Sequence, residues 1–495
     1  MRESIESGDT RIGTPKILAY SSMYMPISMV LLPVGVYVLP FYAELGISMY
    51  LMSVIIFAAR LSDAITDPLI GVLSDRTKGR FGRRKPWILG GAPLLMVSLY
   101  MLFVPGENPT PLYFGFWIVL LYLAFTIVDL PYFAWGAELS TNYDERTRIT
   151  AVREQFHFAG TISFNLLPIV AALLIYLTTV DVDSVSGMLN TFVGEFQEIM
   201  RSRAGHIDVI LMWLANFVLI AIPVTVILSL IMVPEVPQKV IERKKPKFFQ
   251  SLRVVRRNGP FVRVIICYTV STLGAAVTAA LSYFFVKHVI LAGELYPIYL
   301  LVYYASSVIG LPVWTALSKR IGKHRAYIAA LIWFAIWASM IPFIPAGMFG
   351  VFLIVMGLKG SSVGALLALP AAMAADAVDI DSARTGEQRA GLYFSIWGLA
   401  KKGSYAAGGA IGLAAAAAFG FDPTVDPAAA GTPAGNSESA LLWLTLLYSI
   451  IPALIKFIAF PFMLKYPLTE VRQQRIRDRL ERRGVTADGT AATTA

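Results

Sequence analysis

Twelve long apolar runs constrain the fold of this chain more than any other feature of its sequence. The hydrocarbon core of a bilayer is about 30 Å thick, so a helix needs about 20 predominantly apolar residues to cross it. Within lipid only helices and closed barrels satisfy every backbone polar group, and runs of this length are typical of helices. The sequence therefore predicts an all-α polytopic membrane protein with helices over 17–44, 47–73, 87–105, 111–137, 150–180, 207–234, 260–291, 295–317, 325–346, 348–375, 391–418 and 438–466.

The positive charges are concentrated in every second loop. The loop at 74–87 contains six Lys or Arg residues, whereas the loops near 105–110, 292–296 and 419–437 contain none. Because cytoplasmic loops carry an excess of Lys and Arg, we expect a multi-pass protein of the cell (inner) membrane with both termini cytoplasmic. The same distribution explains the net charge of +10 without a nucleic-acid partner, so the expected partners are the lipid bilayer and a small-molecule substrate.

A polar, basic segment at 235–258 divides the twelve runs into six and six. A basic loop that opens with a serine follows the second run of each half, at Ser74 and at Ser318. This recurrence indicates two parallel six-helix repeats with the substrate path between them, near the middle of the membrane. The expected organisation is a cytoplasmic N-terminus at 1–16, an N-terminal bundle at 17–234, a cytoplasmic linker at 235–258, a C-terminal bundle at 259–466 and a basic cytoplasmic tail at 467–495.

Carboxylates inside the second and fourth runs are the strongest functional signal. Asp63 and Asp67 lie one helical turn apart, and Thr126 and Asp129 share a face of the fourth helix. A carboxylate at the bilayer centre costs about 2.5–3.5 kcal/mol on insertion scales, and a proline follows closely in each helix, at Pro68 and Pro131, and frees a backbone carbonyl. Several oxygens of this kind suit a hard cation such as sodium, lithium or a proton.

A structural interpretation of the same residues stays open. Asp63 could pair with Arg60 on its own helix, and Asp67 or Asp129 could cap a kink. The repetition on two helices, each with a proline close behind, favours a cation site.

Three segments resemble the glycoside-pentoside-hexuronide:cation symporters of the major facilitator superfamily, the melibiose permease group. The segments are RLSDAITDPLIGVLSDRTKGRFGRRKPW at 60–87, TIVDLPYF at 126–133 and AADAVDIDSARTGEQRAGLYFSIWGLAKKGSYAAGG at 374–409. The resemblance implies the major facilitator fold, with twelve helices in two six-helix pseudo-repeats. It also implies that Asp63 and Asp67 bind the cation, that Thr126 contributes to this site, that Asp129 links the cation and substrate sites, and that Lys401 is the lysine of the eleventh helix near them.

The substrate positions depart from those of the sugar permeases that the chain resembles. Ile27, Phe133 and Phe156 align where those permeases carry an aspartate, a tryptophan and an arginine. An apolar wall cannot satisfy the hydroxyls of a disaccharide, although Arg153 and His157, with neighbouring Glu154 and Gln155, could replace polar contacts. We therefore expect cation-coupled import of a glycoside or a related small organic solute by alternating access. The alternative is a sodium-dependent symporter of lysolipids or other amphiphiles, because such symporters share the DAITDP element.

The basic loop at 74–87 is a topology signal and a candidate gate. Arg76, Arg83 and Arg84 could bind acidic groups near the cytoplasmic helix ends and hold the inner gate shut in the outward-facing state. The candidate acceptors are Glu138, Asp144, Asp376, Asp379 and Asp381.

The sequence shows no sign of an enzyme active site. Four scattered histidines and one cysteine, Cys267, offer neither a nucleophile with an oriented base nor a ligand cluster, so no cofactor beyond the coupling cation is expected. A receptor or scaffold would have no reason to retain Asp63 and Asp67, and a monomer is the expected functional unit. Lys359 is expected to line the substrate cavity, to snorkel or to pair with a backbone carbonyl. Segment 181–206 is expected to form a short amphipathic helix at the outer interface, which serves as a lid or belongs to a plain interfacial loop.

Overall fold

The computed structural model describes residues 12–77, 81–140, 143–179, 207–234, 255–385, 390–464 and 466–467. In these ranges the chain is all-helical and forms no strand. The first half consists of α1 (Thr14–Ser22), α2 (Tyr24–Pro33), η1 (Val34–Val38), α3 (Leu39–Glu44), α4 (Met49–Arg76), α5 (Lys85–Phe103), α6 (Pro111–Glu138), α7 (Tyr143–Thr179) and α9 (Ile207–Met232).

The second half begins with α11. It consists of α11 (Gly259–His288), η3 (Gly293–Leu295), α12 (Tyr296–Ile321), α13 (Lys323–Met340), η4 (Ile341–Phe343), α14 (Phe349–Gly360), α15 (Val363–Thr385), α16 (Ala390–Ala418), η5 (Pro427–Ala429), α17 (Glu438–Tyr448), α18 (Ile450–Phe457) and α19 (Phe460–Leu464).

The helices confirm the twelve expected spans. Ten helical stretches of the described chain are long and apolar enough to cross a membrane. The 37-residue α7, whose charged residues lie in its first third, and the 29-residue α16, which carries Lys401 and Lys402, complete the twelve. The largest differences lie at two polar ends, since α7 begins at Tyr143 and α15 continues to Thr385. Helices continue there beyond the apolar run because intrahelical hydrogen bonds do not need lipid.

Three of the twelve spans contain breaks. The first has a π-helical turn, η1, directly after Pro33, and the tenth is divided between Gly360 and Val363. The twelfth is divided at Ser449, three residues before Pro452. Proline removes one intrahelical hydrogen bond, so kinks of this kind have an identifiable local cause in the first and twelfth spans.

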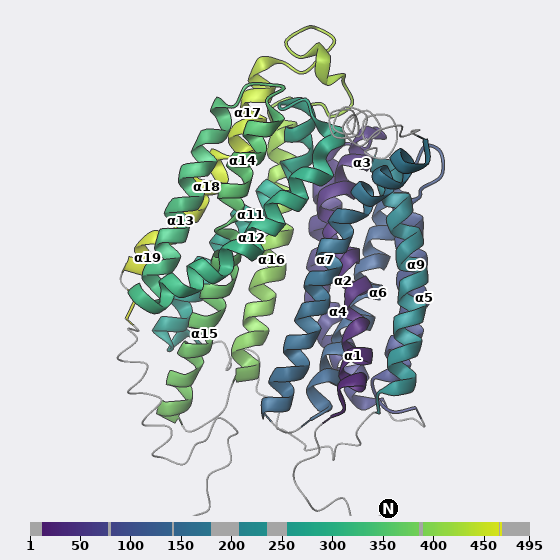
Figure 1. Ribbon diagram of the computed structural model, residues 1–495, viewed down its shortest axis with the longest axis vertical. Coiled ribbons are helices and arrows are strands. Elements are labelled where there is room, and N and C mark those ends of the chain that lie inside the picture. The colour runs from purple at the N-terminus through teal and green to yellow at the C-terminus, as the bar shows by residue number, and fades with distance from the viewer. Residues whose placement is uncertain are drawn as a thin grey trace, which may run out of the picture.

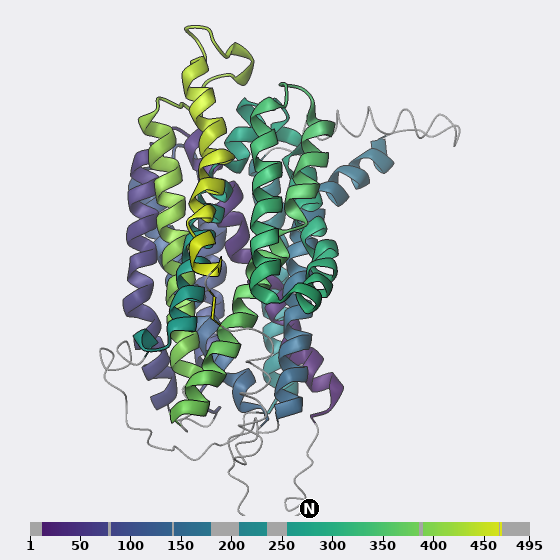
Figure 2. The ribbon, with the colours of Figure 1, turned by 90° about the vertical axis from the view of Figure 1, so that its left-hand side faces the viewer.

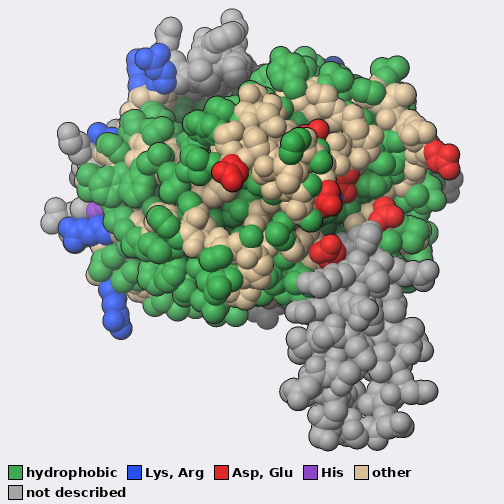
Figure 3. Space-filling view, turned by 90° about the horizontal axis from the view of Figure 1, so that it is seen from above, with side chains coloured by type: hydrophobic (Ala, Val, Ile, Leu, Met, Phe, Trp, Pro, Cys, Tyr) green, Lys and Arg blue, Asp and Glu red, His purple; other side chains and the backbone are tan. Residues whose placement is uncertain are grey.

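The helices form two bundles whose axes run roughly along the long axis of the molecule (Figure 1). The N-terminal end of α1 lies at the bottom in this view, at the end where α4 finishes at Arg76; we call this the basic end. The loop at 419–437 projects beyond the helices at the top in both Figures 1 and 2. Seen from that opposite end, acidic side chains are scattered over the face, while Lys and Arg are visible only at its edge (Figure 3).

The hydrophobic cores show where the two bundles meet. One core runs through the first bundle and continues into the second only toward the opposite end, through residues such as Phe285 and Tyr296. A second core, which includes Phe261 and Tyr393, lies in the second bundle toward the basic end. The two bundles therefore share buried apolar packing at the end away from the basic loops.

Polar and aromatic contacts join the bundles at the same end. Lys287 Nζ of α11 lies 2.6 Å from Glu44 Oε1 of α3, and both side chains are about one quarter exposed. The rings of Tyr37 and Tyr296 meet edge to face with their centroids 5.3 Å apart. Hence the structure represents a conformation that is closed at the end opposite the basic loops.

Four predicted segments lie wholly or largely outside the described residues. These are the N-terminus up to residue 11, the outer segment 181–206, the linker up to residue 254 and the tail beyond residue 467. Their proposed roles remain predictions.

Gly310 of α12 lies directly against the break in the tenth span. A Cβ atom added to Gly310 would overlap the backbone carbonyl of Ser361, whereas one added to Gly350 would meet nothing within 4 Å. Backbone cannot rotate away as a side chain can, so the two helices must separate to accommodate any larger residue.

We predict that Gly310→Ala lowers the free energy of unfolding by about 1–3 kcal/mol, the usual cost of overpacking. The matched variant Gly350→Ala should leave stability unchanged or raise it by about 0.5–1 kcal/mol through helix propensity. Thermal unfolding can be followed by dye labelling of the single buried cysteine, Cys267. Equal stability of the two variants would contradict the close packing at Gly310.

Candidate functional site

Two of the predicted cation ligands are in direct contact. Helices α4 and α6 pack side by side, which places the hydroxyl of Thr126 next to Asp67. Thr126 Oγ1 donates a hydrogen bond of 3.1 Å to Asp67 Oδ1. Asp129 lies three residues further along α6, and its Oδ1 is buried without a hydrogen-bond donor among the described residues. The two helices thus bring oxygen ligands together, as their sequence pattern predicts.

Asp63 is only 3% exposed and lies near Arg60, one turn earlier on the same helix. Arg60 Nη1 is 3.6 Å from Asp63 Oδ2, which is an ion pair but too long for a strong hydrogen bond. The Arg60 guanidinium also lies over the ring of Tyr122, 3.9 Å from its centroid. The local ion pair considered from the sequence is therefore present, and it leaves the Asp63 oxygens free of tight hydrogen bonds to Arg60.

A lysine from the other bundle binds Asp67. Lys402 Nζ of α16 forms an ion pair with Asp67 Oδ2, so Asp67 is held by Thr126 on one side and by the second half on the other. Lys402 also interacts electrostatically with Asp63 and Asp129. This is the charged contact that joins α4 to α16 in the middle of the molecule.

The sequence assigned the eleventh-helix role to the adjacent Lys401. In the structure the Lys401 side chain is exposed and interacts with Asp129 electrostatically, whereas Lys402 makes the contact with Asp67. Neighbouring residues on a helix point about 100° apart, so only the packing of α16 against α4 decides between the two lysines.

The carboxylates do not converge on a ready-made metal cage in this conformation. Within the described ranges no three or more His, Cys, Asp or Glu residues lie close enough together to hold a metal ion. The Lys402 ammonium takes the place at Asp67 that a cation would need. The donor set of carboxylate and hydroxyl oxygens nevertheless suits a hard monovalent cation as cargo.

An aromatic and cationic cluster lies next to Asp129. Tyr24 of α2 stacks on His157 of α7 at 5.3 Å and meets Phe133 of α6 edge to face at 5.3 Å. The Arg153 guanidinium lies over Phe133, 4.1 Å from the ring centroid, and pairs with Glu154 at 2.8 Å. We call Tyr24, Phe133, Arg153 and His157 the aromatic cluster. Arg153 interacts electrostatically with Asp129, so the cluster and the carboxylates are electrostatically connected.

Two of the predicted substrate positions, Ile27 and Phe156, are not part of the aromatic cluster. Ile27 is 0% exposed and belongs to the hydrophobic core, while the first span contributes Tyr24 to the cluster, and Ser28 donates a hydrogen bond of 3.4 Å to the carbonyl of His157. Phe156 is half-buried, and the ring and guanidinium contacts of α7 come from His157 and Arg153. Alignment of the sequence determined the helix but not its rotation, which only packing determines.

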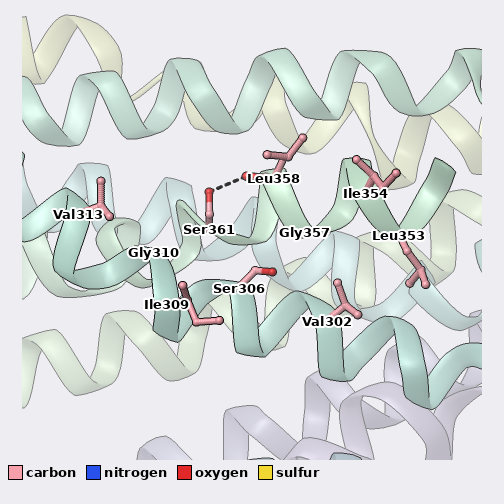
Figure 4. A pocket seen from close by; sticks show the side chains of 10 residues that line it. All are labelled: Val302, Ser306, Ile309, Gly310, Val313, Leu353, Ile354, Gly357, Leu358 and Ser361. Carbon is pink, nitrogen blue, oxygen red and sulfur yellow. Dashed lines mark hydrogen bonds between the residues drawn. The ribbon is translucent and has the colours of Figure 1, made fainter. Parts of the chain in front are cut away.

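The second half has no acidic counterpart of this site. Pro312 precedes Ser318 by the same six residues that separate Pro68 from Ser74, so Leu311 stands where Asp67 does in the first half. Between α12 and α14 lies a cavity of about 560 Å³ (Figure 4). It is lined mainly by apolar side chains with the hydroxyls of Ser306 and Ser361, and Ser361 donates to the carbonyl of Leu358 at 2.7 Å. The predicted cation ligands therefore have no acidic counterpart at the equivalent position of the second half.

Two of the predicted gating arginines converge on one carboxylate. Arg83 Nη2 and Arg84 Nη2 lie 3.0 and 2.7 Å from Glu138 Oε1 at the end of α6. Arg84 also pairs with Asp75 at 2.5 Å and donates to Ser74 Oγ at 2.8 Å. Burial lowers the pKa of Arg84, but its hydrogen bonds to Glu138 and Asp75 and their charges outweigh burial and raise that pKa above its usual value.

The second half repeats this arrangement. Lys323, which follows the second span of that half, pairs with Asp376 of α15 at 2.5 Å. Arg76 is exposed at the end of α4, and the side chain of Asp379 lies outside the described part of the structure. The ion pairs of Glu138 and Asp376 thus lie within each half, as expected for a conformation whose bundles share packing only at the opposite end.

Comparison with known proteins identifies the family. A family model described as MFS/sugar transport protein matches residues 19–470. The chain belongs to this family. It is therefore a transporter of the major facilitator superfamily, which agrees with the resemblance stated from the sequence.

The individual proteins that match this chain are distant from it in sequence. The uncharacterized symporter sll1374 of Synechocystis sp. is 26% identical, over 88% of this chain and 91% of its own. The sodium-dependent lysophosphatidylcholine symporter 1-A of Danio rerio is 25% identical, over 85% of this chain and 79% of its own. The crystal structure of the nucleoside transporter NupG matches with a TM-score of 0.57 and 12% identity, over 92% of this chain and 100% of that one. The last likeness shows the fold.

Glu138 should contribute more to stability than the other acceptor of Arg84. The Glu138 side chain is 11% exposed and accepts from two arginines, whereas Asp75 is 62% exposed. We predict that Glu138→Gln lowers the free energy of unfolding by about 2 kcal/mol, because hydrogen bonds to charged groups contribute about 1.5–3 kcal/mol. The control Asp75→Asn should cost less than about 1 kcal/mol, as exposed pairs do. Equal losses in thermal unfolding would contradict a central role for Glu138.

Proposed function

We propose that this transporter is a cation-coupled symporter that imports a small organic solute by alternating access. The observation that carries the proposal is the double engagement of Asp67, by Thr126 of the first half and by Lys402 of the second. A receptor or scaffold would have no need of such a charged contact at membrane depth, where ionisable residues are costly and usually functional.

The shared carboxylate provides a mechanism of coupling. A sodium ion or proton that binds Asp67 must compete with the Lys402 ammonium. Two unit charges about 4 Å apart interact by about 4 kcal/mol at an effective dielectric of about 20, so exchange of lysine for cation changes the balance between the halves substantially. A ligand shifts a conformational equilibrium by its differential affinity for the two states, and this competition supplies such a difference.

Asp63, Asp67, Thr126 and Asp129 are the proposed cation ligands. Asp63 contributes a carboxylate one turn from Asp67, and Asp129 follows Thr126 on α6. Carboxylate and hydroxyl oxygens serve sodium, lithium and protons alike, and the sodium dependence in the name of one relative makes sodium the first ion to test. Asp129 interacts electrostatically with both Lys402 and Arg153, so it is the proposed link between cation and substrate.

We place the basic end of the molecule in the cytoplasm, with both termini there, in the cell (inner) membrane. The contacts at the opposite end, including Glu44 with Lys287, then close the outer side, and the structure is inward-facing. In the outward-facing state we propose that Arg76, Arg83 and Arg84 reach acidic residues of the second half, Asp376 and Asp379 among them. The boundaries 17–234 and 259–466 are proposed for the two bundles, which act together in a monomer.

The aromatic cluster is the proposed substrate site. Tyr24 and Phe133 offer ring faces to a glycoside, and Arg153 offers a guanidinium to a hydroxyl, a carboxylate or a phosphate. A glycoside or related solute with an apolar part is the first candidate, in keeping with the sugar-transport description of the family. The second candidate is an amphiphile with an anionic head group. It is favoured by Arg153, whose guanidinium lies against the apolar ring of Phe133.

Uptake into proteoliposomes tests coupling. We predict that an inward sodium gradient drives accumulation of a labelled glycoside with an apolar aglycone, and that Asp67→Asn reduces the accumulation ratio to about one while exchange of labelled for unlabelled substrate persists. The control Asp208→Asn, at the first turn of α9, should accumulate substrate as the wild type does. Gradient-driven accumulation by Asp67→Asn at the wild-type ratio would rule out the coupling role.

Two substitutions in the aromatic cluster distinguish the substrate candidates. For an amphiphile with an anionic head group, Arg153→Gln should weaken binding at least about tenfold, since charge-assisted hydrogen bonds contribute about 1.5–3 kcal/mol. For a neutral glycoside, Phe133→Ala should have the larger effect. Calorimetry with lysophosphatidylcholine, an aryl glycoside and melibiose would measure both, and we expect melibiose to bind weakly. Tight binding of melibiose by the wild type would contradict the apolar character assigned to the site.

A further inference from the structure

Two lysines are buried in the interior of the second bundle, away from the proposed cation site. Lys359 of α14 is 0% exposed and Lys456 of α18 is 4% exposed. Both ammonium groups lie over the ring of Phe334 of α13, at 5.0 Å and 4.6 Å from its centroid. The Lys359 ammonium also lies 5.0 Å from the centroid of Tyr448. Two lysine side chains therefore face the same aromatic ring inside the protein.

The hydrogen-bond partners of the two ammonium groups differ. Lys456 Nζ donates to the carbonyl oxygen of Ser271 at 3.0 Å and to its hydroxyl at 3.3 Å. Lys359 Nζ has no hydrogen-bond partner among the described residues. All three of its N–H groups are therefore available to a further acceptor.

No carboxylate can balance these charges from the surrounding helices. Helices α11, α12, α13, α14, α16 and α18 contain no Asp or Glu, and between Gly259 and Ala375 the only acidic residue is Glu294, which lies in η3 at the end opposite the basic loops. Two further helices that pack in this bundle, α15 and α17, do carry acidic residues, but Asp376 of α15 pairs with Lys323 and Glu438 lies at the first position of α17. The two ammonium groups thus share an interior that the sequence leaves without negative charge.

Burying an ammonium without a counter-charge is costly, and the ring contacts of Lys359 offset only part of that cost. A buried cation is tolerated when an anion accepts its hydrogen bonds. We propose that Lys359 and Lys456 form a binding site for one small monovalent anion of halide size, with chloride as the physiological ligand. The two ammonium groups supply the charge, and the Lys359 N–H groups supply the hydrogen bonds.

The size of the anion follows from the geometry. Both ammonium groups lie within 5.0 Å of the Phe334 ring centroid and Lys359 is fully buried, so this interior admits at most a small ion and no solute. A Cβ atom added to Gly274 of α11 would lie 2.9 Å from the carbonyl of Pro452 and 3.5 Å from Lys456 Cγ, so α11 and α18 pack closely around the lysine stem. An anion held here would connect α14 to α18 and stabilise the second bundle, without contact with Asp67.

The test is the stability of the purified full-length protein in chloride, bromide or gluconate at constant sodium. We expect halides to raise the unfolding temperature of the wild type saturably, by about 2 °C or more over gluconate. Lys359→Met and Lys456→Met should each abolish the halide shift. The control Lys85→Met, which removes a lysine that donates to the carbonyl of Leu230 and lies over the ring of Trp135, should keep it.

A wild-type stability that is the same in chloride and gluconate would overturn the proposal, as would a Lys359→Met variant with the full halide shift. If the lysine variants do not fold, anomalous scattering from crystals of the wild type grown in bromide decides the question. Bromide within hydrogen-bond distance of Lys359 Nζ supports the site, and bromide at other positions alone contradicts it.

Discussion

The ion pair between Asp67 and Lys402 connects the two halves of this transporter at membrane depth. Among the described residues it is the contact in which a carboxylate of the candidate cation site is bound by the opposite bundle. The Lys402 and Asp67 side chains are 35% and 24% exposed, so the pair is partly desolvated and each group is stabilised by the other or by a substitute of the same charge. Any cation that reaches Asp67 must therefore act on the interface between the halves, and cation binding and conformational change become parts of one equilibrium.

The two halves of the protein differ in the residues that they contribute near this contact. Both halves repeat the same helices and the same pairing of a basic loop with an acidic helix end, seen at Glu138 and at Asp376. The carboxylates of α4 and α6, however, have no acidic equivalent between α12 and α14, where the cavity is mainly apolar. One repeat thus carries the candidate cation ligands, and the other contributes Lys402, which pairs with Asp67.

The fold could be predicted from the sequence because its signals are local. Runs of about 20 apolar residues specify spanning helices without knowledge of their neighbours, and the described helices follow the predicted spans closely. The contact of Thr126 with Asp67 was also foreseeable, because each residue precedes a proline on the polar face of its helix, Asp67 directly before Pro68 and Thr126 five residues before Pro131. The choice of Lys402 over Lys401, and of Tyr24 over Ile27, was not. Each depends on the rotation of a helix against a partner far away in the sequence, which periodicity in a nearly uniformly apolar helix does not fix.

The competition between Lys402 and the cation can be measured directly as the sodium affinity of Lys402→Met relative to wild type and to Lys401→Met, by calorimetry at constant ionic strength. If Lys402 occupies the carboxylate that sodium needs, its removal should tighten sodium binding. Release of one third of a charge interaction of about 4 kcal/mol corresponds to about tenfold in affinity. Lys401→Met should bind sodium as the wild type does. Weaker or unchanged sodium binding by Lys402→Met would contradict the account, because Lys402 would then not compete for Asp67.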